Sequence, residues 1–311
     1  MNHDDLKTIR IGTRGSKLAL WQAHWVKSAL QSTGTCSEIV VIHTSGDQNR
    51  EGPIAEIGSQ GVFTKEIQRA LLVCEIDVAV HSLKDLPTEK VDALVLAATP
   101  KRGSYCDVFV SNKASTLQDL PDNVPDSARI GTGSARRKAQ LIHHFGDRFR
   151  VLDIRGNVET RLQKLHNGEY DAIILAEAGL VRLGLVDQIT SRLEKPFFLP
   201  SVGQGILGLE IRENDVAAHQ ALQGINDPET FAAATAERTL LTTLRGGCLA
   251  PIAALAETEN GILTLHARVF SQDGKKMLEA KQKGDSAHPR ELGVLVAEEL
   301  FSQGAESLLR N

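Results

Sequence analysis

The stretch RIGTRGS at residues 10–16 returns, one residue shorter, as RIGTGS at residues 129–134. Each copy completes a short apolar run typical of a β-strand and then opens a segment with the apolar spacing of a helix. Two strand–turn–helix units of one pattern predict two related α/β domains whose ligand-facing ends carry similar turns. The alternative is a chance match over six residues.

Short β-rich runs alternate with helical patterns around both copies, which favours sheets covered by helices. The helical spacing after the first copy is carried by Leu18, Trp21 and Trp25. The expected strands are residues 8–13, 38–44, 77–82, 107–111, 128–132, 150–154 and 171–176.

The C-terminal part reads differently. One helix is expected over residues 229–245, and two strand-like runs flank the hairpin signal Asn260-Gly261. Asp273-Gly274 marks a second tight turn, and a last helix begins near Pro289. This pattern predicts a small α+β domain that follows a boundary at Asp227-Pro228.

Composition excludes several classes of protein. The 311 residues are 41% hydrophobic with a formal net charge of −4, which argues against a general nucleic-acid or membrane-surface binder. The chain shows no apolar run near the roughly 20 residues of a membrane span and no signal-peptide pattern, so a cytoplasmic location is expected. The four cysteines, Cys36, Cys74, Cys106 and Cys248, form no C-x-x-C pair. Neither a disulfide framework nor a metal site is therefore expected.

Two adjacent histidines do not change the expectation about metals. His143 and His144 point about 100° apart on a helix, which is not the spacing of metal ligands. We expect both to be exposed.

Basic residues gather at three expected helix starts, although the partial positive charge there disfavours them by roughly 0.3–1 kcal/mol. A bound anion would reverse this penalty, because backbone N–H groups, hydroxyls and guanidinium groups would converge on it. The sequence therefore predicts a site for a polyanion, with solvated arginines as the alternative. The residues concerned are Arg14 and Lys17 beside Ser16, then Arg136, Arg137 and Lys138 after Ser134, and finally Arg155 and Arg161.

Phosphate-loop motifs do not decide between carboxylates and phosphates. GQGILG at residues 203–208 has the G-x-G-x-x-G spacing, but LGLEIR at residues 207–212 reads as a strand. A dinucleotide fingerprint needs a helix at that point, so this function is rejected.

Two further stretches carry chemistry. DVAVHSLKDLPT at residues 77–88 leads a strand directly into Lys84 and Asp85, where a carboxylate could act as general acid or base or stabilise a cation. The alternative for Asp85 is a turn residue. Cys248 lies in the expected loop RGGCLAP at residues 245–251. The residues alone do not decide whether its thiol is a nucleophile, a covalent tether or inert.

Together these stretches resemble the porphobilinogen deaminase (hydroxymethylbilane synthase) family over nearly the whole chain. IGTRGSKLALWQA, VAVHSLKDLPT, IGTGSARRKAQL, RGNVETRLQKL, DAIILAEAGLVRLGL, LPSVGQGILGLE and AERTLLTTLRGGCLAPIAAL occur in the family's order. The resemblance implies two type II periplasmic-binding-protein-like α/β domains around a cleft, and a small C-terminal α+β domain. The implied division is residues 1–101 with 205–224, then 105–200, then 228–311.

The resemblance also implies the activity. One dipyrromethane cofactor would be attached through Cys248, and four porphobilinogen molecules would be deaminated and joined head to tail on it. Hydroxymethylbilane and ammonia would be released by a monomeric, cytoplasmic enzyme of porphyrin biosynthesis. Asp85 would be the catalytic carboxylate. Cofactor contacts would come from Ser82, Lys84, Thr132, Ser134, Arg136, Arg137, Arg155 and Gly156, and substrate contacts from Arg14, Ser16, Gln22, Arg161 and Gln204.

The chain departs from the family's usual residues at several positions, namely Glu56, Gln60, Gly103, Gly133 and Ala135. Glu56 and Gln60 replace lysines, and Gly133 replaces a serine. The alternative function is a two-domain module that binds a small anion without covalent chemistry, and an inactive relative is a third possibility.

Overall fold

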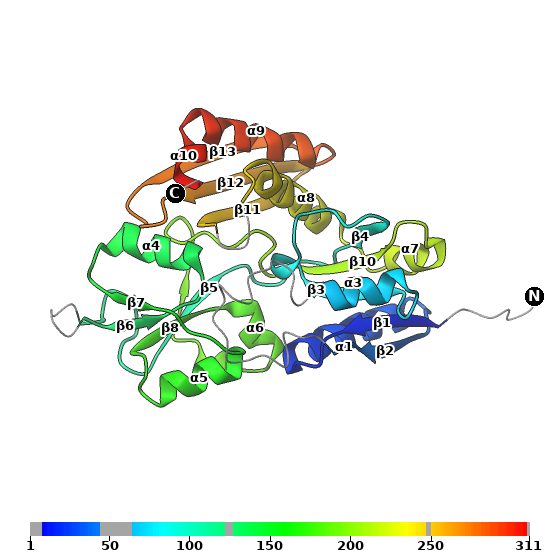
Figure 1. The fold of residues 1–311 in the computed structure, drawn as a ribbon, viewed down its shortest axis with the longest axis horizontal. Coiled ribbons are helices and arrows are strands. Elements are labelled where there is room, and N and C mark those ends of the chain that lie inside the picture. The colour runs from blue at the N-terminus through cyan, green and yellow to red at the C-terminus, as the bar shows by residue number, and fades with distance from the viewer. Residues whose placement is uncertain (1–7, 44–63, 122–126, 247–249, 310–311) are drawn as a thin grey trace, which may run out of the picture. The chain divides into compact units, whose positions relative to one another are not determined.

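The computed structural model describes residues 8–43, 64–121, 127–246 and 250–309. The chain divides into two compact units, one spanning Met1–Arg102 with Ile206–Phe231 and the other Gly103–Gly205 with Ala232–Asn311. The first unit contains one sheet and the second contains two (Figure 1). The chain therefore leaves the first unit, forms a second sheet and returns before its C-terminal part.

The first unit is built on a five-stranded sheet of order β2-β1-β3-β10-β4. β1 runs parallel to β2 and β3, whereas β10 runs antiparallel to β3 and β4. Parallel neighbours place the C-terminal ends of β1 and β3 at one edge, where such sheets bind ligands. The strands are β1 (Ile9–Thr13), β2 (Ser37–Val41), β3 (Val78–Ser82), β4 (Leu94–Ala98) and β10 (Leu207–Arg212).

Helices cover both faces of this sheet. α1 (Lys17–Ser32) and α7 (Val216–Gln223) share an apolar cluster with Val80 of β3. α3 (Lys65–Leu72) packs in a different cluster that contains Ala79. Because successive strand residues point to opposite faces, α3 covers the face opposite to α1 and α7.

The second unit repeats this plan in a sheet of order β7-β6-β8-β5-β9. β6 is parallel to β7 and β8, and β5 is antiparallel to β8 and β9. The shared strand order confirms the two related α/β domains and the predicted fold class, while the cleft stays a prediction. The elements are β5 (Asp107–Ser111), β6 (Arg129–Gly131), β7 (Arg150–Leu152), β8 (Ala172–Ala176), β9 (Ser191–Leu193), α4 (Ala135–Phe145), α5 (Val158–His166) and α6 (Glu177–Arg182).

The repeated RIGT sequence has a structural cause. Arg10 donates from its backbone N–H and its guanidinium to Asp77, at N–O distances between 2.9 and 3.1 Å. Arg129 makes the same set of bonds to Asp171, between 2.8 and 3.2 Å. Burial alone would raise the pKa of Asp171, but hydrogen bonds from Arg129 and Lys113 hold that pKa well below its usual range. Each arginine thus ties its own strand, β1 or β6, to the start of the parallel neighbour, β3 or β8.

The glycine of each RIGT copy lies against the residue before that aspartate. A Cβ at Gly131 would lie 2.8 Å from Cδ1 of Tyr170, and one at Gly12 would lie 2.1 Å from Cδ1 of Ile76. Gly131→Ala is therefore expected to lower the free energy of unfolding by about 1–3 kcal/mol, as measured by urea titration. Gly179→Ala is the control, because its added Cβ would lie 3.6 Å from Val158 in ordinary contact. Equal stability of the two variants would contradict this account.

The C-terminal α+β part forms as expected, with an antiparallel sheet of order β11-β12-β13. Asn260 and Gly261 have φ values of 52° and 77°, the left-handed pair that a tight hairpin requires. α9 lies along the sheet beside β13 (Figure 1). The elements are α8 (Pro228–Thr243), β11 (Ile252–Glu259), β12 (Ile262–Phe270), β13 (Met277–Asp285), α9 (Pro289–Ser302) and α10 (Ala305–Leu309).

The structure differs from the sequence predictions in a few places. β4, β9 and α10 are not predicted by the sequence pattern. The expectation that His143 and His144 are exposed is wrong, because both are half-buried. The ring of His144 stacks on Phe197 with a centroid distance of 4.1 Å, and the ring of His143 meets Phe270 edge-on at 5.8 Å. The three predicted domain boundaries stay a prediction. No helix in the described part of the chain is long and apolar enough to cross a membrane.

Candidate active site

The first predicted ligand turn lies between β1 and α1. Ser16 caps α1, and its Oγ accepts a hydrogen bond from the backbone N–H of Ala19 at 3.3 Å. The first turn of α1 contains no acidic residue, and Arg14 and Lys17 flank the cap. This turn therefore presents a positive helix end with two basic side chains beside it.

The second turn follows β3. Ser82 ends the strand, and its Oγ accepts a hydrogen bond from Nε2 of Gln22 on α1 at 2.7 Å. Lys84 and Asp85 then lie on a single 3₁₀ turn, which the buried side chains of Leu83 and Leu86 anchor to the core. Asp85 itself is exposed. Apolar packing thus holds the turn at both ends, and Asp85 remains exposed to solvent.

These two turns lie at one edge of the first sheet, because β1 and β3 are parallel neighbours that end there. Five of the predicted site residues meet at this edge. They are Arg14, Ser16, Ser82, Lys84 and Asp85, with Gln22 bonded to Ser82.

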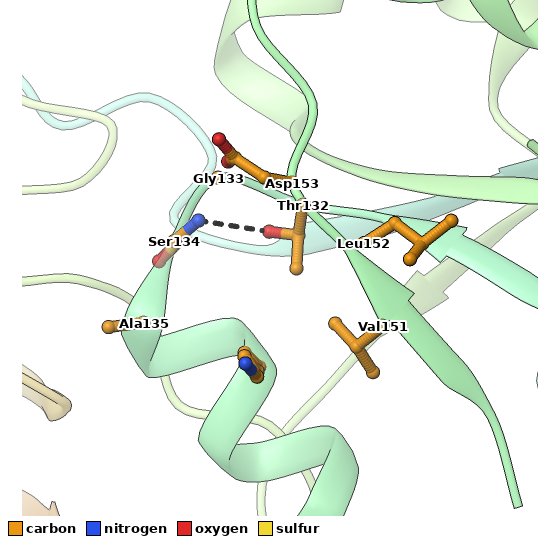
Figure 2. A pocket seen from close by; sticks show the side chains of 8 residues that line it. Thr132, Gly133, Ser134, Ala135, Val151, Leu152 and Asp153 are labelled. Atoms are coloured by element: carbon orange, nitrogen blue, oxygen red, sulfur yellow. Dashed lines mark hydrogen bonds between the residues drawn. The ribbon is translucent and has the colours of Figure 1, made fainter. Parts of the chain in front are cut away.

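The second unit carries an equivalent turn between β6 and α4. Ser134 caps α4, where its Oγ accepts from the N–H of Arg137 at 3.4 Å, and its own N–H donates to Oγ1 of Thr132 at 3.2 Å. Figure 2 shows the pocket at this helix end, whose volume is about 190 Å³. Thr132, Ser134, Lys138 and Asp153 are among the residues that line it.

Arg136 and Arg137 do not point into solvent. Both are buried, at 4% and 5% exposure, and both pair with Asp107 at the start of β5. Nη1 of Arg136 lies 2.6 Å from Oδ2 of Asp107, and Nη2 of Arg137 lies 2.8 Å from Oδ1. Backbone carbonyls of Leu199 and Ile174 accept further hydrogen bonds from the two guanidiniums.

Asp107 is a residue that the sequence reasoning missed. Gln204 also donates to it, from Nε2 to Oδ1 at 3.0 Å, so Asp107 joins three of the predicted site residues. Burial alone would raise the pKa of Asp107, but Arg136 and Arg137 hold that pKa well below its usual range. The sequence feature that could have revealed Asp107 is a carboxylate at the first position of an otherwise apolar strand.

The third predicted helix start, after β7, is also confirmed as a capped helix. Asn157 caps α5 by accepting from the N–H of Thr160 at 2.8 Å. Arg155 pairs with Asp153, with Nε 3.1 Å from Oδ2, and Arg161 donates to the carbonyl of Gly156 at 2.8 Å. Gly156 has a φ of 110°, and a Cβ there would lie 2.6 Å from Thr160, so only glycine fits.

Both sheets therefore end in hydroxyls, helix N-termini and basic side chains, a chemistry suited to a ligand with several carboxylates. Residues 9–220 match the family model described as "Porphobilinogen deaminase, dipyromethane cofactor binding domain". Residues 231–302 match the model for the C-terminal domain of the same enzyme. The chain belongs to the porphobilinogen deaminase family.

Full-length relatives agree with this assignment. Porphobilinogen deaminase of Trichlorobacter lovleyi is 45% identical over 98% of this chain and 96% of its own length. Porphobilinogen deaminase of Francisella tularensis subsp. novicida is also 45% identical, over 98% of this chain and 100% of its own. This is therefore a porphobilinogen deaminase, a transferase with a dipyrromethane cofactor, rather than an anion-binding module without covalent chemistry.

Solved structures similar to this deaminase include periplasmic binding proteins. A periplasmic substrate-binding protein of an ABC transporter from Coxiella burnetii aligns with a TM-score of 0.45 and 13% identity, over 74% of this chain and 97% of that one.

The residues of the second unit fit a dipyrromethane, whose acetate and propionate groups are carboxylates. Nε of Arg136 is buried, and it has no hydrogen-bond partner among the residues that the structure describes. A buried donor is normally satisfied, so this nitrogen is suited to a ligand oxygen. Thr132 and Ser134 line the pocket at the N-terminus of α4, where they supply hydroxyls. Cys248, the predicted attachment residue, lies outside the described residues.

One departure from the family's usual residues has a local structural correlate. A Cβ at Gly133 would lie 3.1 Å from Oδ1 of Asp153 and 3.0 Å from the carbonyl of Ile154. Figure 2 shows Asp153 beside Gly133 at the pocket. The usual serine would therefore require small shifts of both the Asp153 carboxylate and the Ile154 carbonyl.

Proposed function

We propose that this deaminase joins four porphobilinogen molecules head to tail on one dipyrromethane attached through Cys248, with loss of one ammonia at each addition. Water then cleaves the bond between the new chain and the cofactor, and the product leaves as hydroxymethylbilane. The observation that supports this most is the pocket at the N-terminus of α4, which Thr132, Ser134 and Lys138 line, on the helix that also carries Arg136 and Arg137. When bound, the cofactor supplies the pyrrole carbon from which the chain grows.

The basic residues hold carboxylates. Each added pyrrole brings two more negative charges, so a growing chain is a polyanion. Ser134 and the α4 N-terminus, with Thr132, Arg136 and Arg137, bind cofactor carboxylates in this proposal, together with Ser82, Lys84, Arg155 and Gly156. Arg14, Ser16, Gln22, Arg161 and Gln204 bind the incoming substrate.

Asp85 performs the electrostatic part of catalysis. Loss of ammonia from porphobilinogen leaves a cationic pyrrole, and a fixed carboxylate stabilises such a charge and can take up a proton. Its short turn, anchored by Leu83 and Leu86, fixes the backbone of Asp85 and leaves the side chain exposed. A carboxylate on a fixed backbone needs less reorganisation as charge develops.

Three further expectations follow from the family resemblance and are part of this proposal. The enzyme acts as a monomer, it works in the cytoplasm, and it divides into the three domains given above.

Intact mass spectrometry tests the proposed covalent chemistry. The purified protein is expected to exceed its sequence mass by two deaminated pyrrole units, and peptide mapping is expected to place the excess on Cys248. Added porphobilinogen should then produce species heavier by one pyrrole unit at a time. Cys248→Ala should carry no excess mass, with Cys36→Ala as the matched control because Cys36 is an exposed thiol. An unmodified mass that persists with porphobilinogen present would overturn the proposal.

A further inference from the structure

A buried polar cluster lies in the first unit, on residues to which no role has been assigned above. It joins His81 on β3, Glu210 on β10 and Gln68 on α3, which are 5%, 6% and 8% exposed. Nε2 of His81 lies 3.1 Å from Oε2 of Glu210. Nε2 of Gln68 lies 3.0 Å from Oε1 and 3.3 Å from Oε2 of the same carboxylate.

The cluster stands on an apolar face of the sheet. Leu209 and Ile211 on either side of Glu210 belong to the cluster under α1 and α7, so Glu210 points to the opposite face. There it lies opposite Ala79, which packs with Ile67 of α3. Burying a carboxylate costs several kcal/mol unless hydrogen bonds compensate it, and apolar residues of similar size are often at least as stable there. Stability alone therefore does not account for Glu210.

The position of His81 points to a role in orientation. His81 directly precedes Ser82, the last residue of β3, and the 3₁₀ turn with Lys84 and Asp85 follows at once. Ser82 points to the other face and accepts a hydrogen bond from Gln22 of α1. The end of β3 is therefore held by side-chain hydrogen bonds from both faces, through His81 on one and Ser82 on the other.

We propose that Glu210 is a positioning residue for catalysis: it holds His81, and through it the end of β3, so that Asp85 keeps its productive place. This inference rests on the proposed role of Asp85. A displacement of about 1 Å at a reacting group is enough to lower a rate by roughly a hundredfold, so a loosened strand end is expected to reduce turnover.

Two substitutions of Glu210 separate positioning from packing. Glu210→Leu keeps similar volume but removes both acceptors, and it is expected to lower kcat by about tenfold or more, with KM changed less than about twofold. Glu210→Gln can still accept from His81 and donate to Gln68 once the Gln68 amide turns over, so its kcat should stay within about threefold of the parent. Rates are expressed per molecule of holoenzyme, counted by intact mass.

The controls make each outcome decisive. Glu213→Leu changes an exposed carboxylate just beyond β10 and should leave kcat unchanged. A purely structural role would lower the unfolding midpoint of Glu210→Leu without changing kcat per holoenzyme, and that result overturns the proposal. If Glu210→Leu does not fold, His81→Phe removes the other end of the bond, and an unchanged kcat there is equally contradictory.

Asp85→Asn is measured alongside, because it tests the role of Asp85 separately from the positioning role of Glu210. Normal turnover of Asp85→Asn would show that the assigned role of Asp85 is wrong, whatever Glu210 does. An inactive Asp85→Asn together with a fully active Glu210→Leu would overturn the positioning role alone.

Discussion

Asp107→Asn is expected to lower the free energy of unfolding by about 3–5 kcal/mol at pH 7, because it leaves two buried guanidiniums without their carboxylate. The same change should reduce the fraction of protein that carries the cofactor, since Asp107 orients Arg136, Arg137 and Gln204. Urea titration followed by far-UV circular dichroism measures the first effect, and intact mass measures the second.

The pH dependence of this effect follows from the lowered pKa of Asp107. A carboxyl whose folded pKa lies below its unfolded value contributes stability above the unfolded pKa, near 4, and loses it as the pH falls through the folded value. The parent should therefore lose this contribution below about pH 4, and the difference between parent and Asp107→Asn should shrink there. A difference that stays constant to pH 2 would show that the charge of Asp107 is not the cause.

Asp187→Asn serves as the matched control, because Asp187 is an exposed carboxylate in the same unit. It should change neither the unfolding free energy nor the cofactor content. If Asp107→Asn behaved like this control, the buried cluster would not hold the arginines in the way described.

Asp85→Asn is expected to lower kcat by about a hundredfold to ten-thousandfold, the usual range for loss of a general acid or base. Its amide retains the shape of the side chain but can neither balance a cation nor take up a proton. The exposed position of Asp85 predicts little change in stability, and the cofactor should remain attached. Steady-state rates with porphobilinogen, intact mass and thermal unfolding are the three measurements.

Glu89→Gln is the control for this substitution, since Glu89 is exposed and lies four residues further along the same segment. Its kcat should match the parent. Turnover of Asp85→Asn within about tenfold of the parent would rule out a catalytic carboxylate at this position.

Local patterns predicted the elements best where apolar runs were long and sharply bounded. The run at residues 107–111 was predictable as a strand, yet the importance of its first residue was not. Asp107 meets Arg136 and Arg137 across 29 and 30 residues of sequence, and no local period connects them. β9 reads Ser-Arg-Leu, and it offers neither an apolar run, as at β7, nor a repeat of another strand, as at β6.

The candidate site was accessible from sequence only in part. The basic helix starts conflict with the helix dipole, so Ser16, Ser134 and their neighbours could be recognised individually. The bond between His81 and Glu210 spans 129 residues and depends on β10 entering the first sheet from a distant part of the chain. Such a pairing depends on the order of strands in the sheet, which cannot be predicted from the spacing of residues along the chain.

The place of β10 between β3 and β4 also has a consequence during synthesis of the protein. The ribosome synthesises every strand of the second sheet before it reaches β10. Until then, β3 and β4 lack the strand that lies between them. At usual elongation rates this interval lasts roughly 5–20 s. Throughout it the nascent chain presents unpaired strand edges, which are open to pairing with other chains. Synthesis of the first α/β sheet therefore starts before that of the second, but the first sheet is completed last.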